Sequence, residues 1–143
     1  MLRMIASGLA LSVALTGAAA AENFEVKMLN RGDAGRMIFE PGFLRIAVGD
    51  TVKFIAEDRS HNAEPIPEMI PEGAAVFAGR INEEIAETFD IEGVYGVRCK
   101  PHYALGMVMT IVVGDVAQAP EWFLEGRIPR SAMKRFEEQL SGL

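Results

Sequence analysis

The chain has 143 residues, one cysteine, two histidines and a formal net charge of −6, and half of its residues are hydrophobic. This length fits one domain whose apolar core needs no disulfide, and a single cysteine excludes an internal one. An acidic chain is a poor match for nucleic acid, which selects a basic surface.

The first 21 residues have the pattern of a secretory signal peptide. Arg3 precedes an apolar run from Ile5 to about Thr16, and small residues follow as far as Ala21. A positive start, a short apolar run and an A-x-A ending are typical of such peptides, and the run is shorter than the roughly 20 apolar residues of a membrane span. We therefore expect cleavage after Ala21 and no membrane association afterwards, with an uncleaved anchor as the alternative.

The mature chain predicts short strands separated by turns. We expect strands over residues 24–28, 37–39, 43–48 and 51–56, with a turn over 30–35 and core-facing Val52, Phe54 and Ala56. Prolines 65, 67 and 71 exclude a regular central strand, and residues 77–80 suit a short edge segment. Residues 84–91 are long enough for a helix, but their period of two favours a strand. The last strands are expected over residues 94–97 and 107–113.

The C-terminal region changes character. Residues 120–126 and 129–140 predict two α-helices, the second with Met133, Phe136 and Leu140 on one face. Seven or eight short strands with turns about every 8–12 residues indicate an all-β Greek-key sandwich. We therefore predict one domain over residues 22–143, with a helical extension over residues 118–143.

Three soft metal-ligand types lie close together around the only cysteine. Cys99, His102 and Met107 occupy one predicted loop between two strands, and His61 follows an earlier apolar strand. Loops gather at the ends of a sandwich, which would let His61 reach Cys99. Thiolate, imidazole and thioether ligands select copper or zinc, and two His with one Cys and a weak axial Met is the blue-copper electron-transfer arrangement.

Each of these residues alone has a simpler interpretation. A lone cysteine is more often a small buried apolar residue, and Met107 is one of eight methionines. The combination favours a metal, but the ligands leave a structural zinc site and a copper-delivery protein open. We do not expect an enzyme, because a catalytic copper site would need further histidines and the predicted site uses both.

The sequence as a whole resembles the cupredoxins, the family of type 1 blue copper proteins. The resemblance covers essentially the whole mature chain, including the two C-terminal helices, which plastocyanin- and amicyanin-type members lack. The motifs that carry it are residues 24–30, 37–41, 49–54, 61–62, 69–71, 81–82 and 93–103. The resemblance implies a periplasmic electron carrier with one copper ion that cycles between Cu(I) and Cu(II).

The resemblance also implies partners and ligand roles. It makes His61, Cys99 and His102 the equatorial copper ligands and Met107 the axial one. The carrier would act as a monomer in transient complexes with redox proteins, taking one electron from a c-type cytochrome and passing it to a copper nitrite reductase or a related denitrification enzyme.

Further residues receive supporting roles from the resemblance. Asn62 would tie the His61 segment to the Cys99 segment and support the thiolate, and Met37 and Pro101 would pack beside an exposed His102. Electrons would leave through the edge of the His102 ring.

The resemblance places an apolar docking patch around His102. Our candidates for this patch are Pro41, Ala104 and Leu105, with Pro101 beside them. Helix-bearing members of the family surround it with lysines, whereas this chain has four lysines in all. The candidates for a steering charge are therefore Arg31, Arg59, Arg98 and Lys100, and we expect the partner preference to differ from the family norm.

Overall fold

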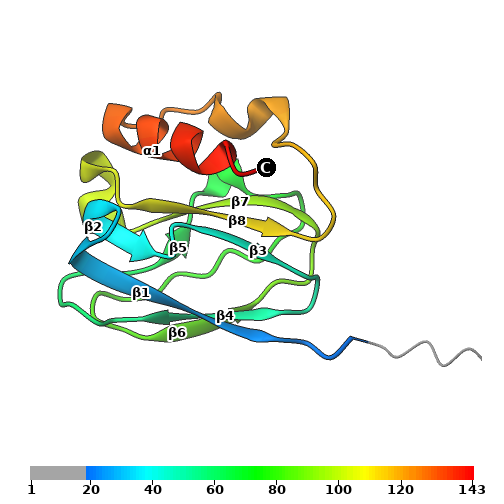
Figure 1. The fold of residues 1–143 in the computed structure, drawn as a ribbon, viewed down its shortest axis with the longest axis horizontal. Coiled ribbons are helices and arrows are strands. Elements are labelled where there is room, and N and C mark those ends of the chain that lie inside the picture. The colour runs from blue at the N-terminus through cyan, green and yellow to red at the C-terminus, as the bar shows by residue number, and fades with distance from the viewer. Residues whose placement is uncertain (1–18) are drawn as a thin grey trace, which may run out of the picture.

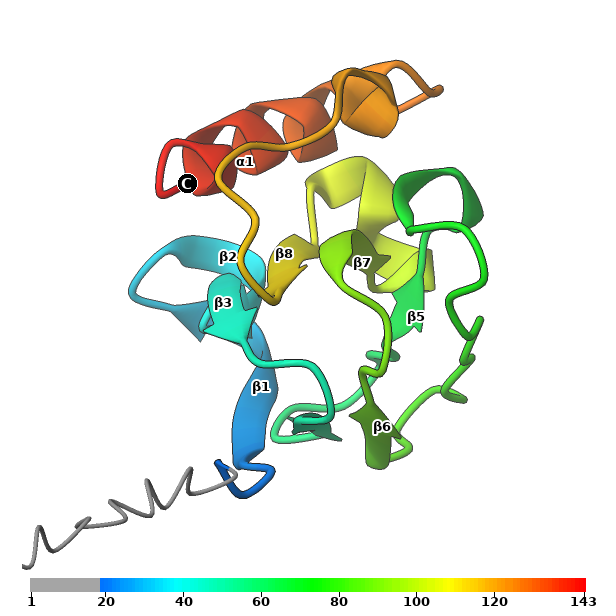
Figure 2. The same cartoon turned by 90° about the vertical axis from the view of Figure 1, so that its right-hand side faces the viewer.

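The protein, described here over residues 19–143 by a computed structural model, has two four-stranded sheets that face each other across an apolar core (Figures 1 and 2). The first sheet has the order β2 (Gly35–Glu40), β1 (Asn23–Gly32), β4 (Thr51–Ile55), β6 (Ile85–Thr88). The second has the order β3 (Phe43–Ile46), β8 (Val108–Val113), β7 (Gly93–Arg98), β5 (Glu64–Pro65). The predicted all-β sandwich is therefore confirmed.

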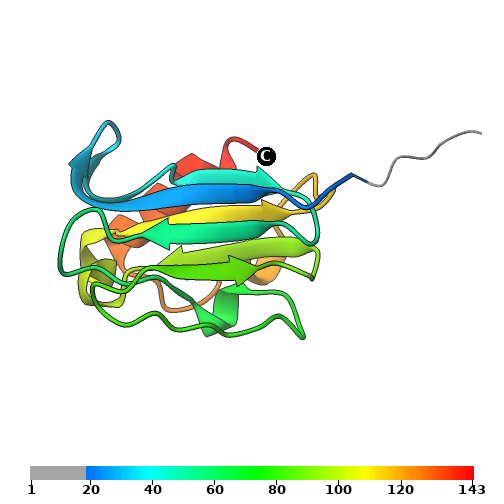
Figure 3. The same ribbon diagram turned by 90° about the horizontal axis from the view of Figure 1, so that it is seen from below.

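The C-terminal helix α1 (Arg130–Leu140) covers the outer face of the second sheet. Figure 1 shows α1 beyond the layer of β7 and β8, and Figure 3 shows the strands in front of it. Ala132 and Phe136 of α1 pack with Val94 and Val108 in a second apolar cluster outside the sandwich. Every residue of β8 is buried, because the first sheet covers one of its faces and α1 the other.

The alternation of side chains along the strands builds the core between the sheets. Val52 and Phe54 are fully buried there, and Ala56 packs against them, as the sequence pattern predicts. Residues 84–91 contain strand β6 and no helix, so the choice of a strand is confirmed.

Some local predictions were wrong. The turn expected over residues 30–35 is confined to Asp33 and Ala34, because β1 runs on to Gly32 and pairs with β2. Residues 77–80 form no strand. The two-residue strand β5 was not predicted; it lies at the edge of its sheet, where a proline is tolerated.

The extension after β8 contains one α-helix instead of the two that the sequence predicts. The first predicted helix is a four-residue 3-10 segment, Glu121–Leu124, which ends before Gly126. Such a short segment cannot close many helical hydrogen bonds. Phe123 nevertheless anchors it, since this ring is buried against Phe136 of α1.

The predicted signal peptide lies almost entirely outside the described residues, which begin at residue 19. From residue 19 onwards, the structure contains no helix with the length and apolar character that crossing a membrane requires.

Candidate metal centre

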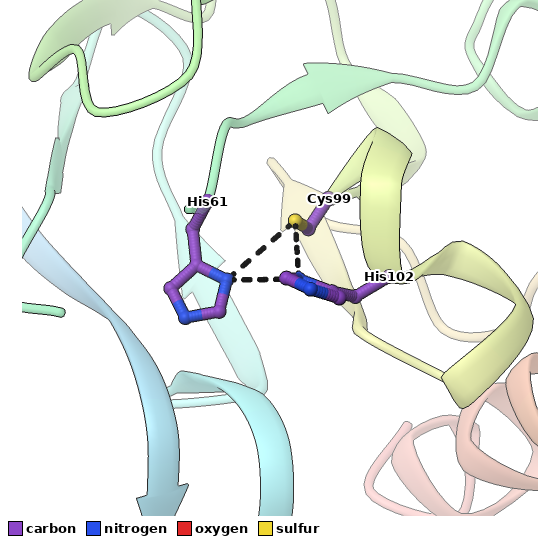
Figure 4. Close-up of side chains that lie close together, drawn as sticks. All are labelled: His61, Cys99 and His102. Carbon is purple, nitrogen blue, oxygen red and sulfur yellow. Dashed lines mark hydrogen bonds between the residues drawn. The ribbon is translucent and has the colours of Figure 1, made fainter. Parts of the chain in front are cut away.

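Two chain segments bring His61, Cys99 and His102 together at one end of the sandwich (Figure 4). His61 lies in the connection between β4 and β5, and Cys99 follows β7 directly. His102 lies in the 3-10 segment Lys100–Leu105. His61 Nδ1 lies 3.1 Å from His102 Nδ1, and the Cys99 sulfur lies 3.8 Å and 3.5 Å from these two nitrogen atoms.

This triangle of donor atoms has the size of a metal site. The circle through three atoms separated by 3.1, 3.5 and 3.8 Å has a radius of about 2.0 Å, close to the roughly 2.0–2.3 Å bonds that imidazole nitrogen and thiolate sulfur form with zinc. Both Nδ1 atoms and the sulfur therefore suit one ion of this size.

Met107 faces the same side of its sheet as Cys99. The register of β7 with β8 ends at Arg98 opposite Val108, so Cys99 and Met107 form the next opposite pair. The Cys99 amide donates to the Met107 carbonyl at 2.9 Å, which keeps the two backbones paired beyond the strands. Both side chains are fully buried in the core between the sheets. This arrangement makes Met107 available as a fourth ligand.

A hydrogen bond to Asn30 orients the His61 ring. His61 Nε2 lies 2.8 Å from Asn30 Oδ1 on β1, and since a carbonyl oxygen only accepts, Nε2 carries the proton. In a neutral ring the lone pair then lies on Nδ1, which faces the cluster. Burial, and then repulsion from His102, lowers the pKa of His61 and favours this neutral form.

The surroundings of Cys99 act on its thiol in two opposite ways. Burial raises the pKa of Cys99, whereas the backbone N–H groups of Asn62 and His102 lower it by hydrogen bonding. Those two N–H groups therefore favour the thiolate, the form that binds metals.

Asn62 connects the two ligand-bearing segments. Its Oδ1 accepts a hydrogen bond of 2.7 Å from the Lys100 amide, and its Nδ2 donates to the Gly79 carbonyl at 3.0 Å and to Glu64 at 3.2 Å. Because Asn62 is buried and adjoins His61, it holds the His61 segment against the backbone that follows Cys99.

The candidate docking residues do not all lie together. Met37 and Leu105 line one hollow with Arg36, and Leu105 is 57% exposed. Pro101 and Ala104 are exposed in the same 3-10 segment as His102, which is itself partly exposed. Pro41 is also exposed, but it does not lie with the other candidates. The carbonyl of its neighbour Gly42 accepts a hydrogen bond from the amide of Thr110, the third residue of β8, so Pro41 lies farther from the metal cluster along the sandwich.

The candidate steering charges differ in their surroundings. Arg31, Arg59 and Lys100 are exposed. Arg98 instead donates from Nε and Nη2 to Glu64 Oε1 at 3.0 Å and 2.9 Å, with only 24% of its side chain exposed, and its guanidinium lies over the Tyr103 ring. The register of β5 with β7 sets Glu64 opposite Arg98. Arg98 is thus neutralised within the molecule.

Sequence reasoning missed three contributors to this end of the molecule: Asn30, Arg36 and Glu64. Asn30 and Arg36 follow the pattern of an ordinary hairpin, and Glu64 lies among prolines. One signal was present for Asn30, because it ends the first of the motifs that carry the family resemblance.

A Greek-key sandwich with two histidines, one cysteine and a methionine at one end defines the cupredoxin class of metal proteins. The particular family follows from sequence: the model "Copper binding proteins, plastocyanin/azurin family" matches residues 26–114. The chain belongs to this plastocyanin/azurin family of copper-binding proteins, so its cofactor is copper, as predicted.

The relatives and solved structures to which the chain is similar include several pseudoazurins. The pseudoazurin of Paracoccus pantotrophus is 39% identical over 96% of this chain and 94% of its own length. That of Methylorubrum extorquens is 46% identical over 77% of this chain and 74% of its own length. The crystal structure of pseudoazurin from Methylobacterium extorquens AM1 matches with a TM-score of 0.80 and 38% identity, covering 84% of this chain and 98% of the other. The resemblance to the cupredoxins is confirmed.

Proposed function

We propose that the chain is a periplasmic type 1 copper protein that carries one electron at a time between redox proteins. His61, Cys99 and His102 would be the equatorial ligands and Met107 the axial one. The observation that carries the proposal is the triangle of donor atoms, with sides of 3.1 to 3.8 Å, in a chain of a copper-binding family. Copper bound there would supply the Cu(I)/Cu(II) couple.

For this function the protein has to hold the ligand side chains in one arrangement while the copper changes its oxidation state. Asn30 fixes the His61 ring, Asn62 fixes the segment after Cys99, and paired backbone holds Cys99 beside Met107. Ligands held on a rigid sandwich keep one geometry in both oxidation states, which lowers the reorganisation that accompanies electron transfer. The hydrogen bonds and apolar groups around the sulfur would tune the potential.

The partly exposed His102 ring is the proposed exit for the electron. Pro101, Ala104 and Leu105 give the 3-10 segment that carries His102 an exposed apolar surface, and Met37 lines a hollow with Leu105. A small patch of this kind suits a transient complex, which needs less buried area than a permanent one. We propose a c-type cytochrome as donor and a copper nitrite reductase or related denitrification enzyme as acceptor.

The charges that would steer the protein toward an acidic partner are those of Arg31, Arg59 and Lys100. Arg36 would add a further charge, because it lines the same hollow as Met37 and Leu105. Arg98 contributes less, because Glu64 neutralises it.

The periplasmic location rests on the signal-peptide pattern of residues 1–21. In an exported protein a single cysteine needs an explanation, and a bound metal supplies one, because it keeps the thiolate from pairing with another chain.

Stopped-flow electron transfer tests this function. The reduced copper protein should reduce a purified copper nitrite reductase, and a c-type cytochrome should reduce the oxidised form. Arg59→Glu should slow association and weaken its salt dependence. Arg45→Glu is the matched control, since Arg45 lies opposite Val112 near the far end of β8. Equal rates for wild type and Arg59→Glu at low salt would refute steering, and a copper protein that exchanges no electrons with either partner would refute the carrier role.

A further inference from the structure

The backbone carbonyl groups on both sides of Met107 accept hydrogen bonds from helix α1. Arg135 Nη1 donates to the Gly106 carbonyl at 2.6 Å, and Gln139 Nε2 donates to the Val108 carbonyl at 3.0 Å. Arg135 and Gln139 are four residues apart and therefore share one face of the helix. Two adjacent turns of α1 thus bind the backbone immediately before and after Met107, the predicted axial ligand.

Gln139 replaces a missing strand partner. In an antiparallel pair the carbonyls point alternately to the two sides, and since the Met107 carbonyl faces β7, that of Val108 faces the β3 side. Strand β3 begins only at Phe43, which is opposite Thr110. Thr110 Oγ1 donates to Gln139 Oε1 at 2.9 Å and so orients the amide toward Val108. The beginning of β8 is therefore held by a helix side chain.

Arg135 joins a third segment to this contact. The same Nη1 donates to the Met37 carbonyl at 2.8 Å, which connects α1 with both β2 and the turn before Met107. The turn is tightly seated: Gly106 has φ of +87°, and a Cβ atom there would lie 2.9 Å from the Ser131 carbonyl oxygen of α1. This backbone has no room to move toward the helix.

We propose that Arg135 and Gln139 are positioning residues that fix the backbone around Met107 and thereby set the strength of its axial contact with copper. The inference rests on the proposed function, because it takes Met107 as a ligand. The hydrogen bonds of both residues go to backbone carbonyl groups and to Thr110, and none of them involves a residue of the metal cluster. A long thioether contact is weak, and small backbone shifts change it more than they change the short equatorial bonds. Helix α1 would thus act on the redox site as well as on stability.

The variants Arg135→Gln and Gln139→Met test this role. Each removes a donor to one of the two carbonyls while keeping a good helix former. Lys134→Gln is the matched control, because Lys134 is 79% exposed on the same helix. Arg135→Lys keeps the charge and should restore part of the effect. All four are compared by urea unfolding, visible and EPR spectra, reduction potential, and the NMR signal of the Met107 methyl group in the copper-free and Cu(I) proteins.

We expect Arg135→Gln and Gln139→Met to shift the Met107 methyl signal in the copper-free protein. In the Cu(II) protein they should change the relative intensities of the visible absorption bands that arise from charge transfer between the Cys99 sulfur and copper. The ratio of oxidised to reduced protein at a fixed applied potential should change by up to about fivefold, the factor that applies when the net strength of one typical hydrogen bond acts on only one of the two oxidation states. Lys134→Gln should leave all of these readouts at the wild-type values.

Folded variants that lose stability but keep the wild-type bands, potential and methyl signal would overturn the inference, since α1 would then only support the fold. If one variant does not fold, the other and Arg135→Lys still decide the question. Failure of the proposed function gives a different result, because wild-type protein loaded with copper would then lack the intense sulfur-to-copper bands.

Discussion

The hydrogen bond from His61 to Asn30 should control how well the site binds metal, and Asn30→Ala removes its acceptor. His61 is fully buried, and its Nε2 lies 2.8 Å from Asn30 Oδ1. Without this acceptor the neutral ring can carry its proton on Nδ1, the atom that faces the metal. We expect about 1 kcal/mol less stability in the copper-free protein, the net value of a typical hydrogen bond.

The effect on copper should be larger. Residues that orient a metal-binding histidine through its second nitrogen are typically worth about 10- to 100-fold in metal affinity, or about 1.4–2.7 kcal/mol. Competition with a Cu(I) chelator of known affinity measures this for wild type and variant. Asn23→Ala is the matched control, because Asn23 is exposed at the opposite end of the same strand. Equal copper affinities for Asn30→Ala and Asn23→Ala would refute the role of this hydrogen bond.

Three further predictions concern separate parts of the molecule. Cys99→Ser should abolish the sulfur-to-copper absorption and leave a folded sandwich by circular dichroism; residual colour would argue against Cys99 as a ligand. Arg98→Gln should cost about 1–2 kcal/mol in urea unfolding, because it strips Glu64 of a mostly buried partner, and a loss as small as that of an exposed ion pair would contradict this. Burial, and then Asp90, raises the pKa of Glu87 above its ordinary 4.5. The folded state then holds this proton more tightly than the unfolded state does, so stability falls as pH rises from below 4.5 through the folded pKa. Glu87→Gln should accordingly raise the melting temperature at pH 7 and not below about pH 4; an equal gain at both would point to another cause.

Much of the sandwich follows from sequence because its strands are locally encoded. The alternation in β4 identifies Val52 and Phe54 as core residues, and turn residues delimit most strands. The short elements were harder. The 3-10 segment Glu121–Leu124 looks like a helix in sequence, and its true form depends on how Phe123 docks under α1. Strand β5 exists only because β7 offers an edge to pair with.

The metal cluster could be predicted in part because two of its three residues are close in sequence. Cys99 and His102 lie within one loop, so their proximity is local, whereas that of His61 follows from the arrangement of the two sheets. The partners of these residues depend on long-range register, which sequence does not display. That Arg98 faces Glu64, and that Arg135 reaches the turn before Met107, are consequences of β5 pairing and helix docking.

The visible and EPR spectrum of the mature protein with one equivalent of Cu(II), recorded before and after ascorbate, tests directly whether Cys99 and the two histidines bind one copper ion. A thiolate bound in a His₂Cys triangle should give an intense absorption band and a narrow copper hyperfine splitting. Ascorbate should bleach the band and an oxidant should restore it. A weak spectrum with the wide splitting of tetragonal Cu(II) would mean that Cys99 and the two histidines do not bind one copper ion together, and would refute the type 1 site.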